Sequence, residues 1–307
     1  MKRVLGVSLG SSQRDHTVQV SMLGEEIELS RKGTDGDLGR AEQLIREHDG
    51  QVDAIGLGGI DVYFFARGER YVVRDGLRLM EAARVTPAVD GSGIKDTLER
   101  DTVQYLLHQT ELLRPTTRVL MVSAVDRFGM AEAFVEIGCP IVFGDLIFSA
   151  GMPYPITTLD ELADIARRIL PEMAKMPFTM LYPTGKEQEK EGASERFQEY
   201  YDAADVIAGD WHFIRKYLPS RIDGKWILTN TTTAKDIAEL RQRGATHVVT
   251  TTPEMAGRSF GTNVIEAMIV ALSGKRPEEL GHEGYAQWLR RLAFEPRIEN
   301  LQGGSAS

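Results

Sequence analysis

Strand, helix and strand alternate repeatedly between residues 118 and 275. The stretch "RVLMVSAVDRFGMAEAFVEIGCPIVF" predicts a strand over 118–122, a helix over 128–137 and a second strand over 140–143. The stretch "KWILTNTTTAKDIAELRQRGATHVVTTTPEM" repeats the pattern, with Gly244 ending its helix. A helix between two buried strands is the crossover of a parallel pair. The alternation therefore predicts an α/β fold with a Rossmann-like, mainly parallel sheet and helices on both faces.

The N-terminal part is richer in strands. "RVLGVSL", "TVQVSML" and "EIELSRK" are short β-type runs, and residues 23–26 form a plausible hairpin turn. An amphipathic helix begins at Asp37, and a buried strand, "VDAIGLGG", follows it. These elements predict a smaller, β-rich α/β domain.

We place the domain boundaries at the glycines of "VDGSGIKDT", which we interpret as a hinge before a long helix that ends near Leu113. The expected organisation is an N-terminal domain over 1–93 and a Rossmann-like domain over 94–296, which a helix over 262–272 closes. A flexible tail is expected over 297–307, because "NLQGGSAS" is small and polar.

Composition excludes several classes of function. The net charge of -9 argues against a general nucleic-acid-binding surface, because phosphate backbones select basic faces. No segment approaches the roughly 20 apolar residues that a membrane-spanning helix needs. No group of His, Cys, Asp or Glu has metal-ligand spacing, so no metal is expected. We expect a cytoplasmic protein, with a homodimer as the default oligomer.

Polar residues follow every predicted strand of the larger domain. In an open parallel sheet, ligands bind beyond the carboxyl ends of the strands. The turn after the strand at 118–122 has no glycine fingerprint, but its helix start and Arg127 suit an anion. The alternative is a helix that Asp126 caps, without any ligand. Polar side chains at these ends predict a small polar ligand.

Our leading prediction is an adenine-nucleotide site for ATP or ADP. Phe128 and Met130 are expected to pack against the adenine, and the loop with Arg258 and Ser259 is a second anion-binding candidate. The predicted contacts are Ser123, Ala124, Asp126, Arg127, Phe128, Gly129, Met130, Asn230, Thr231, Thr232, Thr251, Thr252, Arg258 and Ser259.

Several stretches also resemble a bacterial family commonly labelled quinate 5-dehydrogenase. They are "RVLGVSLGSS", "IGLGGIDVY", "VDGSGIKDTLER", "VSAVDRFGMAEA", "FGDLIF", "AGDWHFIRKYLP" and "TTTPEMAGRSFGTNVIEA". The resemblance implies an NAD(P)-dependent dehydrogenase of a quinate- or shikimate-like hydroxy acid. Proton transfer would then involve Lys95, Asp145, Asp210 and His212. The third alternative is a non-enzymatic small-molecule sensor.

Overall fold

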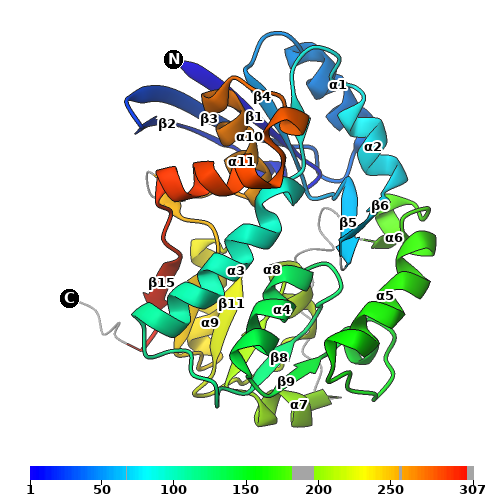
Figure 1. Ribbon diagram of the computed structural model, residues 1–307, viewed down its shortest axis with the longest axis vertical. Helices are drawn as coiled ribbons and strands as arrows, with labels where there is room; N and C mark the ends of the chain where they lie inside the picture. Colours follow the sequence, from blue (N-terminus) through cyan, green and yellow to red (C-terminus); the bar gives the residue numbers. More distant parts are fainter. Residues whose placement is uncertain (67, 182–196, 256–257, 303–307) are drawn as a thin grey trace. The chain divides into compact units, whose positions relative to one another are not determined.

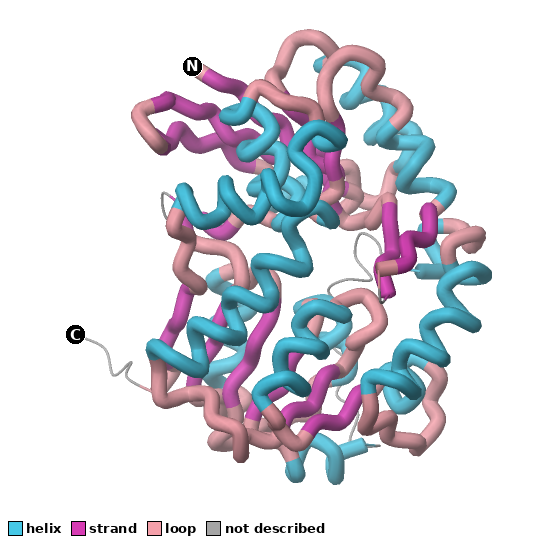
Figure 2. The backbone as a smooth tube through the Cα atoms, in the orientation of Figure 1, coloured by secondary structure: helices cyan, strands magenta, loops and turns pink. Residues whose placement is uncertain are grey.

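The alternation of strands and helices produces two parallel-type sheets, each in its own compact unit. The computed structural model describes residues 1–66, 68–181, 197–255 and 258–302. Unit 1 contains Met1–Lys95, Arg168–Glu189 and Glu254–Phe294, and unit 2 contains Asp96–Arg167, Lys190–Pro253 and Glu295–Ser307. Figure 1 labels the elements of both units, and Figure 2 colours them by type.

The sheet of unit 1 has the strand order β2-β3-β1-β4-β7. Its strands are β1 (Lys2–Ser8), β2 (His16–Met22), β3 (Glu25–Gly33), β4 (Ala54–Gly58) and β7 (Ala88–Val89). β1 pairs in parallel with β3 and β4, whereas β2 and β3 are antiparallel. Leu23 and Gly24 have φ of 54° and 85° and form a two-residue turn between β2 and β3, within the turn expected over 23–26. A second hairpin joins β5 (Tyr63–Ala66) to β6 (Glu69–Val72).

Helices pack on the sheet of unit 1 through an apolar face. Leu5 and Ile55 of the strands form one core with Ile45 of α1 (Leu38–His48), Leu79 of α2 (Arg74–Met80) and Phe178 of α6 (Phe178–Leu181). This core is the main reason for the stability of unit 1, since apolar burial contributes about 25 cal/mol for each Å². α10 (Thr262–Ser273) packs on β1 and β4, and α11 (Pro277–Leu292) follows it.

The sheet of unit 2 has the order β15-β12-β11-β10-β8-β9. Its parallel strands are β8 (Val119–Met121), β9 (Ile141–Phe143), β10 (Val206–Ala208), β11 (Trp226–Thr229) and β12 (His247–Thr250), and β15 (Arg297–Asn300) is antiparallel to β12. A π-helical turn over Asp145–Ser149 follows β9, and α5 (Leu159–Met173) and α7 (Gln198–Ala203) precede β10. The parallel order results from helical crossovers between successive strands.

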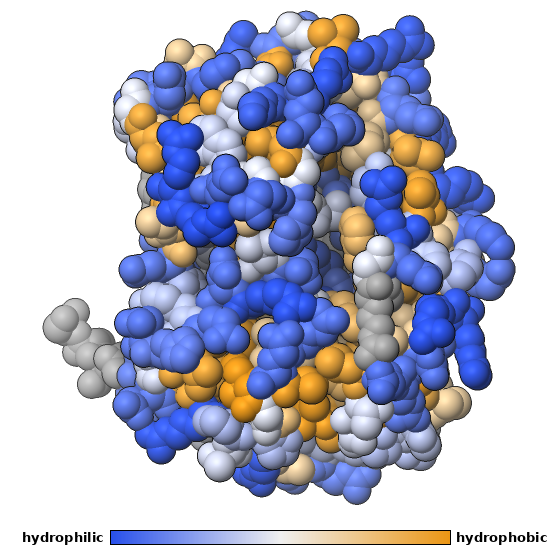
Figure 3. Space-filling view, in the orientation of Figure 1, coloured by the Kyte–Doolittle hydropathy of each residue, from blue (hydrophilic) through white to orange (hydrophobic). Residues whose placement is uncertain are grey.

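Helices cover both faces of this second sheet (Figure 1). They are α3 (Ser92–Gln109), α4 (Phe128–Ile137), α8 (Trp211–Tyr217) and α9 (Ala234–Gln242). Ile214 of α8 and Leu240 of α9 are fully buried in one core with Ile207 and Ile227 of the strands. Leu107 of α3 and other side chains on these helices remain partly exposed, and Figure 3 shows hydrophobic side chains gathered over α3 and α4. The predicted α/β fold, with a mainly parallel sheet and helices on both faces, is confirmed.

The units do not coincide with the predicted domains 1–93, 94–296 and 297–307. The helix expected over 262–272 forms as α10, but it belongs to unit 1 because it covers β1 and β4. Residues 297–300, expected in a flexible tail, form β15, whose backbone pairs with β12. Residues 303–307 lie outside the described part of the chain.

Within the described residues, none of the helices combines the length and the apolar character that crossing a bilayer requires.

Replacing Gly56 with alanine is expected to destabilise unit 1. A Cβ atom there would lie 2.6 Å from the carbonyl oxygen of Asn263, where α10 begins. Backbone cannot move aside as a side chain does, so we expect a loss of about 1–3 kcal/mol in urea unfolding. Gly284→Ala is the control, because its Cβ would meet Leu280 at an ordinary 3.4 Å. Equal stability of the two variants would contradict the close approach of α10.

Candidate functional site

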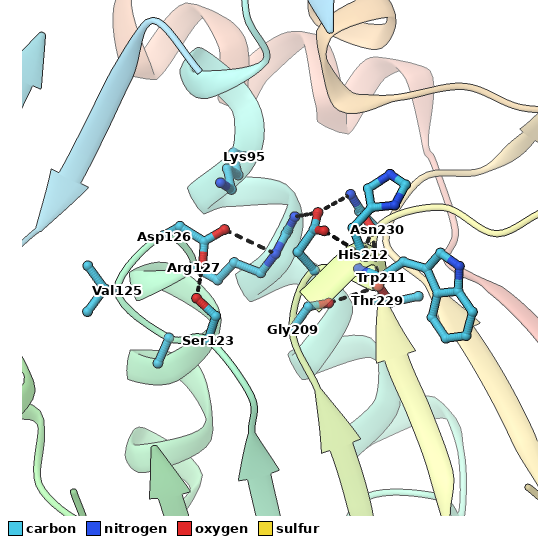
Figure 4. A network of polar contacts seen from close by, with 12 residues as sticks. Lys95, Ser123, Val125, Asp126, Arg127, Gly209, Trp211, His212, Thr229 and Asn230 are labelled. Atoms are coloured by element: carbon cyan, nitrogen blue, oxygen red, sulfur yellow. Dashed lines mark hydrogen bonds and ion pairs between the residues drawn. The ribbon is translucent and has the colours of Figure 1, made fainter. Parts of the chain in front are cut away.

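Four neighbouring parallel strands bring the predicted polar turns to one edge of the unit 2 sheet. β8, β10, β11 and β12 point the same way, so their carboxyl ends lie together. We call the residues after these strands the strand-end rim: 123–127, 209–212, 230–232 and 251–252. Figure 4 shows many of these side chains in one polar network. The rim is the candidate ligand site, as parallel α/β sheets favour this edge.

Arg127 is the cation of the strand-end rim, and carboxylates of this chain already pair with it. Its side chain is only 5% exposed, and its guanidinium donates to the buried Glu99 of α3. A second nitrogen lies 3.0 Å from Oδ2 of Asp210, and Nε lies 3.9 Å from Oδ2 of Asp126. The predicted phosphate contact is therefore corrected, because three carboxylates already neutralise this guanidinium.

Asp210 ties the end of β10 to the ends of its neighbours. Its Oδ1 accepts from the backbone N–H of His212 at 2.8 Å and so caps α8. Its Oδ2 also accepts from Nδ2 of Asn230 at 2.8 Å. Oδ1 of Asn230 in turn accepts from the N–H of Trp211 at 3.2 Å. The amide and the carboxylate therefore hold each other in fixed orientations.

Asp145 occupies the position where a phosphate was expected. Its Oδ1 accepts from the backbone N–H groups of Ala124 and Val125 at 3.0 and 3.1 Å. Burial, and next the charge of Asp126, raise the pKa of this carboxyl to about 7. The turn therefore does use its N–H groups to bind an acceptor, but the acceptor is a carboxyl side chain of the protein.

A carboxylate of the chain also forms hydrogen bonds at the start of the helix that follows β11. Oδ2 of Asp236 accepts from both the backbone N–H and the hydroxyl of Thr233 at 2.7 Å, which makes a capping box at the start of α9. At the start of α4, Asp126 instead accepts from the hydroxyl of Ser123 at 2.8 Å. Acidic side chains therefore dominate the helix starts of the strand-end rim.

The residues expected to enclose an adenine ring belong to the protein core. Met130 is fully buried and Phe128 is 6% exposed, both in the first turn of α4. Gly129 is explained by helix packing, since a Cβ atom there would lie 2.0 Å from Oδ1 of Asp96 on α3. The predicted adenine contacts are corrected, because these side chains are used in packing α4.

The four predicted catalytic residues belong to two different units. Asp210 and His212 are neighbours at the start of α8, and Asp145 is buried beneath the 123–127 turn. Lys95 belongs to unit 1, where its Nζ lies 4.0 Å from Oδ1 of Asp61. Within the described residues, no three His, Cys, Asp or Glu side chains form a metal-ligand group.

The predicted threonine turns do lie in the strand-end rim. Thr252 donates through its hydroxyl to the carbonyl of Asn230 at 3.0 Å, and Thr251 is buried beside it. Thr232 is 7% exposed, and its hydroxyl has no hydrogen-bond partner among the described residues, whereas Thr231 is half-buried. Arg258 and Ser259 form β14 in unit 1, and their side chains lie outside what the structure describes.

Glu99 is the functional-site neighbour that the sequence analysis missed. It is 2% exposed and pairs with Arg127 from a helix position 28 residues away. Its spacing from Val103 and Leu106 places a carboxylate on the apolar face of α3. A charged residue on this apolar face could have predicted a buried ion pair, because a buried carboxylate needs a charged or hydrogen-bonding partner.

The comparison with solved structures finds matches that cover nearly the whole chain, and the descriptions of three of them name a sugar. A structure from Mycobacterium smegmatis in complex with β-D-fucofuranose has 10% identity and a TM-score of 0.38, covering 98% of this chain and 92% of its own. A galactofuranose binding protein has 11% identity and a TM-score of 0.36, and the match covers 98% of this chain and 95% of that protein. The periplasmic binding protein component of the arabinose ABC transporter from Shewanella sp. ANA-3 has 10% identity and a TM-score of 0.34. That match covers 100% of both chains.

Several sequence-based predictions are corrected at this point. These structures are described with bound sugars, as a sugar-binding protein or as a periplasmic binding protein, in contrast to the predicted ATP, ADP or NAD(P) cofactor and cytoplasmic location. The adenine-nucleotide prediction is wrong, and the occupied N–H groups of the 123–127 turn give the physical reason. The dehydrogenase prediction is wrong as well.

Family comparisons replace the resemblance to the family labelled quinate 5-dehydrogenase, which is wrong. No curated protein sequence matches this chain. Residues 3–90 match a domain of unknown function, DUF8753. Residues 93–301, more than half of the chain, match a second domain of unknown function, DUF8754. The chain therefore belongs to the family of this second domain, DUF8754.

Proposed function

We propose that this protein binds a small, uncharged, polyhydroxylated molecule, a sugar or a cyclic polyol, at the strand-end rim of unit 2. One observation carries the proposal: the N–H groups and the guanidinium that would attract an anion are already held by carboxylates of the chain. Asp145 holds the 123–127 turn, Asp210 caps α8, and Asp236 accepts from the N–H of Thr233, the N-cap of α9. An added phosphate would have to displace a bound carboxylate at each place.

The charge balance of the strand-end rim favours hydroxyl groups over anions. Arg127 is matched by Glu99, Asp126 and Asp210, so carboxylates outnumber guanidinium groups in this network. A carboxylate accepts hydrogen bonds and repels a second anion. A sugar hydroxyl donates to a carboxylate without adding charge, and this hydrogen bond is stronger than one between neutral groups.

Neutral polar groups complete the set that a sugar needs. Asn230 offers an amide held in place by Asp210 and Trp211. The hydroxyl of Thr232 is buried without a partner among the described residues, and an unsatisfied buried hydroxyl costs about 1–3 kcal/mol. A ligand hydroxyl removes that cost. Sugars are also the ligands named for the similar solved structures, but the proposal rests on the rim residues.

The test is a calorimetric titration of the purified protein with neutral pentoses, hexoses and cyclic polyols. A ligand that binds only the folded state also raises the melting temperature, so a thermal-shift panel selects the sugars for titration. We expect at least one neutral sugar or polyol to bind, and ATP and NAD+ to produce no shift. The absence of binding by every neutral sugar and polyol at millimolar concentration would overturn the proposal.

A matched pair of variants locates the binding. Asp126→Asn keeps the shape of the side chain and removes a charged acceptor, and we expect affinity to fall about tenfold, the cost of one charge-assisted hydrogen bond. Asp223→Asn makes the same chemical change at an exposed residue before β11, where Arg221 pairs with it. Affinity should be unchanged in this control; an equal loss in both variants would place the ligand elsewhere.

A further inference from the structure

Glu266 of α10 is a buried carboxyl group that the proposed function does not use. It is 3% exposed, and its Oε2 accepts from the backbone N–H of Gly91 at 2.7 Å and more weakly from that of Gly93 at 3.4 Å. These glycines belong to "VDGSG", the stretch that the sequence analysis interprets as a hinge. The carboxyl therefore joins α10 to the turn from which α3 starts.

The turn leaves no space around this carboxyl. A Cβ atom on Gly93 would lie 2.4 Å from Oε1 of Glu266 and 2.7 Å from the ring of Tyr285 on α11. Gly91 has a φ of 96°, and a Cβ on it would meet the start of α10 at 2.8 Å. Two glycines are needed here because the carboxyl, the ring and the helix all contact the turn backbone.

Asp90 and Tyr285 lie beside Glu266 in this part of unit 1. Asp90 is buried in the same turn, where its carboxylate accepts from the N–H groups of Val62 and Ser92 at 2.6 and 3.0 Å. Tyr285 of α11 is buried beside Glu266, which together with burial raises the pKa of its phenol. Tyr63 of β5 and Glu278 of α11 belong to the same electrostatic neighbourhood, and the Arg70 guanidinium lies 4.5 Å from the Tyr63 ring centre.

Burial, and next the charge of Asp90, raise the pKa of Glu266 to about 8. The protonated carboxyl fits this environment, whereas the ionised form is buried beside a second carboxylate. Water hydrates the ionised form only when the turn opens, because the closed turn has no space around the group. Ionisation therefore favours opening of the turn.

We propose that Glu266 is a proton-operated clamp on the turn at residues 90–93. When Glu266 is protonated, the clamp holds the first turn of α3 against α10. When it is ionised, repulsion from Asp90 and the need for hydration release the turn. α3 is a segment through which the chain passes from unit 1 into unit 2, so the clamp controls the rigidity of one connection. This inference is independent of the ligand proposed for the strand-end rim.

Amide hydrogen exchange of the full chain, followed by mass spectrometry across a pH series, tests the clamp. Intrinsic exchange rates are corrected at each pH, so that the remaining change reports opening. Below about pH 4.5, and again above about pH 8, we expect protection of residues 91–96 to be independent of pH, because the closed and open turns then bind the same number of protons. Between about pH 4.5 and pH 8 protection should fall about tenfold for each pH unit, because in that range the closed turn binds one proton more than the open one.

Two variants separate the clamp from general instability. Glu266→Gln keeps the size and one acceptor oxygen, and its protection at 91–96 should no longer depend on pH. Glu278→Gln removes one charge from an exposed position on α11 and should retain the wild-type profile. If Glu266→Gln fails to fold, the wild-type protein provides the test by itself. Its protection must then decrease with pH at residues 91–96 and not in α1. A flat wild-type profile, or a pH-dependent Glu266→Gln variant, overturns the clamp.

Discussion

Arg127→Met is expected to lower the free energy of unfolding of unit 2 by about 3–5 kcal/mol, one of the largest losses for a single substitution in this chain. The guanidinium is 5% exposed and pairs with Glu99, which is 2% exposed, and with Asp210. Its removal leaves a buried carboxylate without this charge partner. Urea unfolding followed by the fluorescence of Trp211 and Trp226, both in unit 2, measures the loss.

Arg118→Met is the matched control for this prediction. Arg118 also pairs with an aspartate, Asp205 at 2.6 Å, but its side chain is 55% exposed and water screens the pair. Its loss should be below about 1 kcal/mol. The double variant Arg127→Met/Glu99→Gln should recover part of the stability, because the buried charge is removed with its partner. Equal losses for the two arginines would show that burial of the Arg127 pair has no energetic consequence.

Asp145→Asn is expected to make the protein more stable than the wild type at about pH 8 and to remove a pH dependence of up to roughly 4 kcal/mol. The folded state raises the pKa of Asp145 from 3.8 to about 7. The folded protein therefore holds this proton more tightly than the unfolded chain does. The stabilisation is complete below about pH 4 and is lost as pH rises to 7. Asparagine keeps an oxygen for the N–H groups of Ala124 and Val125 and cannot ionise.

Urea unfolding at about pH 5 and pH 8 measures this effect as the difference between variant and wild type. The subtraction removes the contribution of Glu266, which both proteins share. Asp223→Asn serves as the control, because Arg221 lowers the pKa of this exposed group and no gain at high pH is expected. A variant that loses stability equally at both pH values would mean that Asp145 acts through shape and not through its proton.

Local patterns predicted a good part of the secondary structure correctly. The turn at Leu23 and Gly24 and the helix that ends at Gly138 depend on residues close together in sequence. Gly138 adopts a left-handed conformation at the end of α4, as a glycine after a helix predicts. Turn residues and hydrophobic periodicity are local, so they could be recognised without knowing what each element packs against.

The candidate site was predicted only as an edge of the sheet. The strand ends were located because parallel strands bring their carboxyl ends together, and Asn230, Asp210 and Arg127 do meet there. Their roles were misjudged, because Arg127 contacts partners 28 and 83 residues away. Such pairings follow from how strands and helices are ordered in space, which periodicity does not reveal.

We could predict the α/β class, the parallel sheet and the polar character of its carboxyl edge from the sequence alone, because strand–helix alternation and side-chain chemistry are local properties of the chain. The three-dimensional packing was needed to show that α10 completes unit 1 and that Asp145 fills the expected phosphate position. The physical reason is the same in both cases. Burial brings distant groups together, and a buried N–H or guanidinium takes whichever acceptor the fold places beside it.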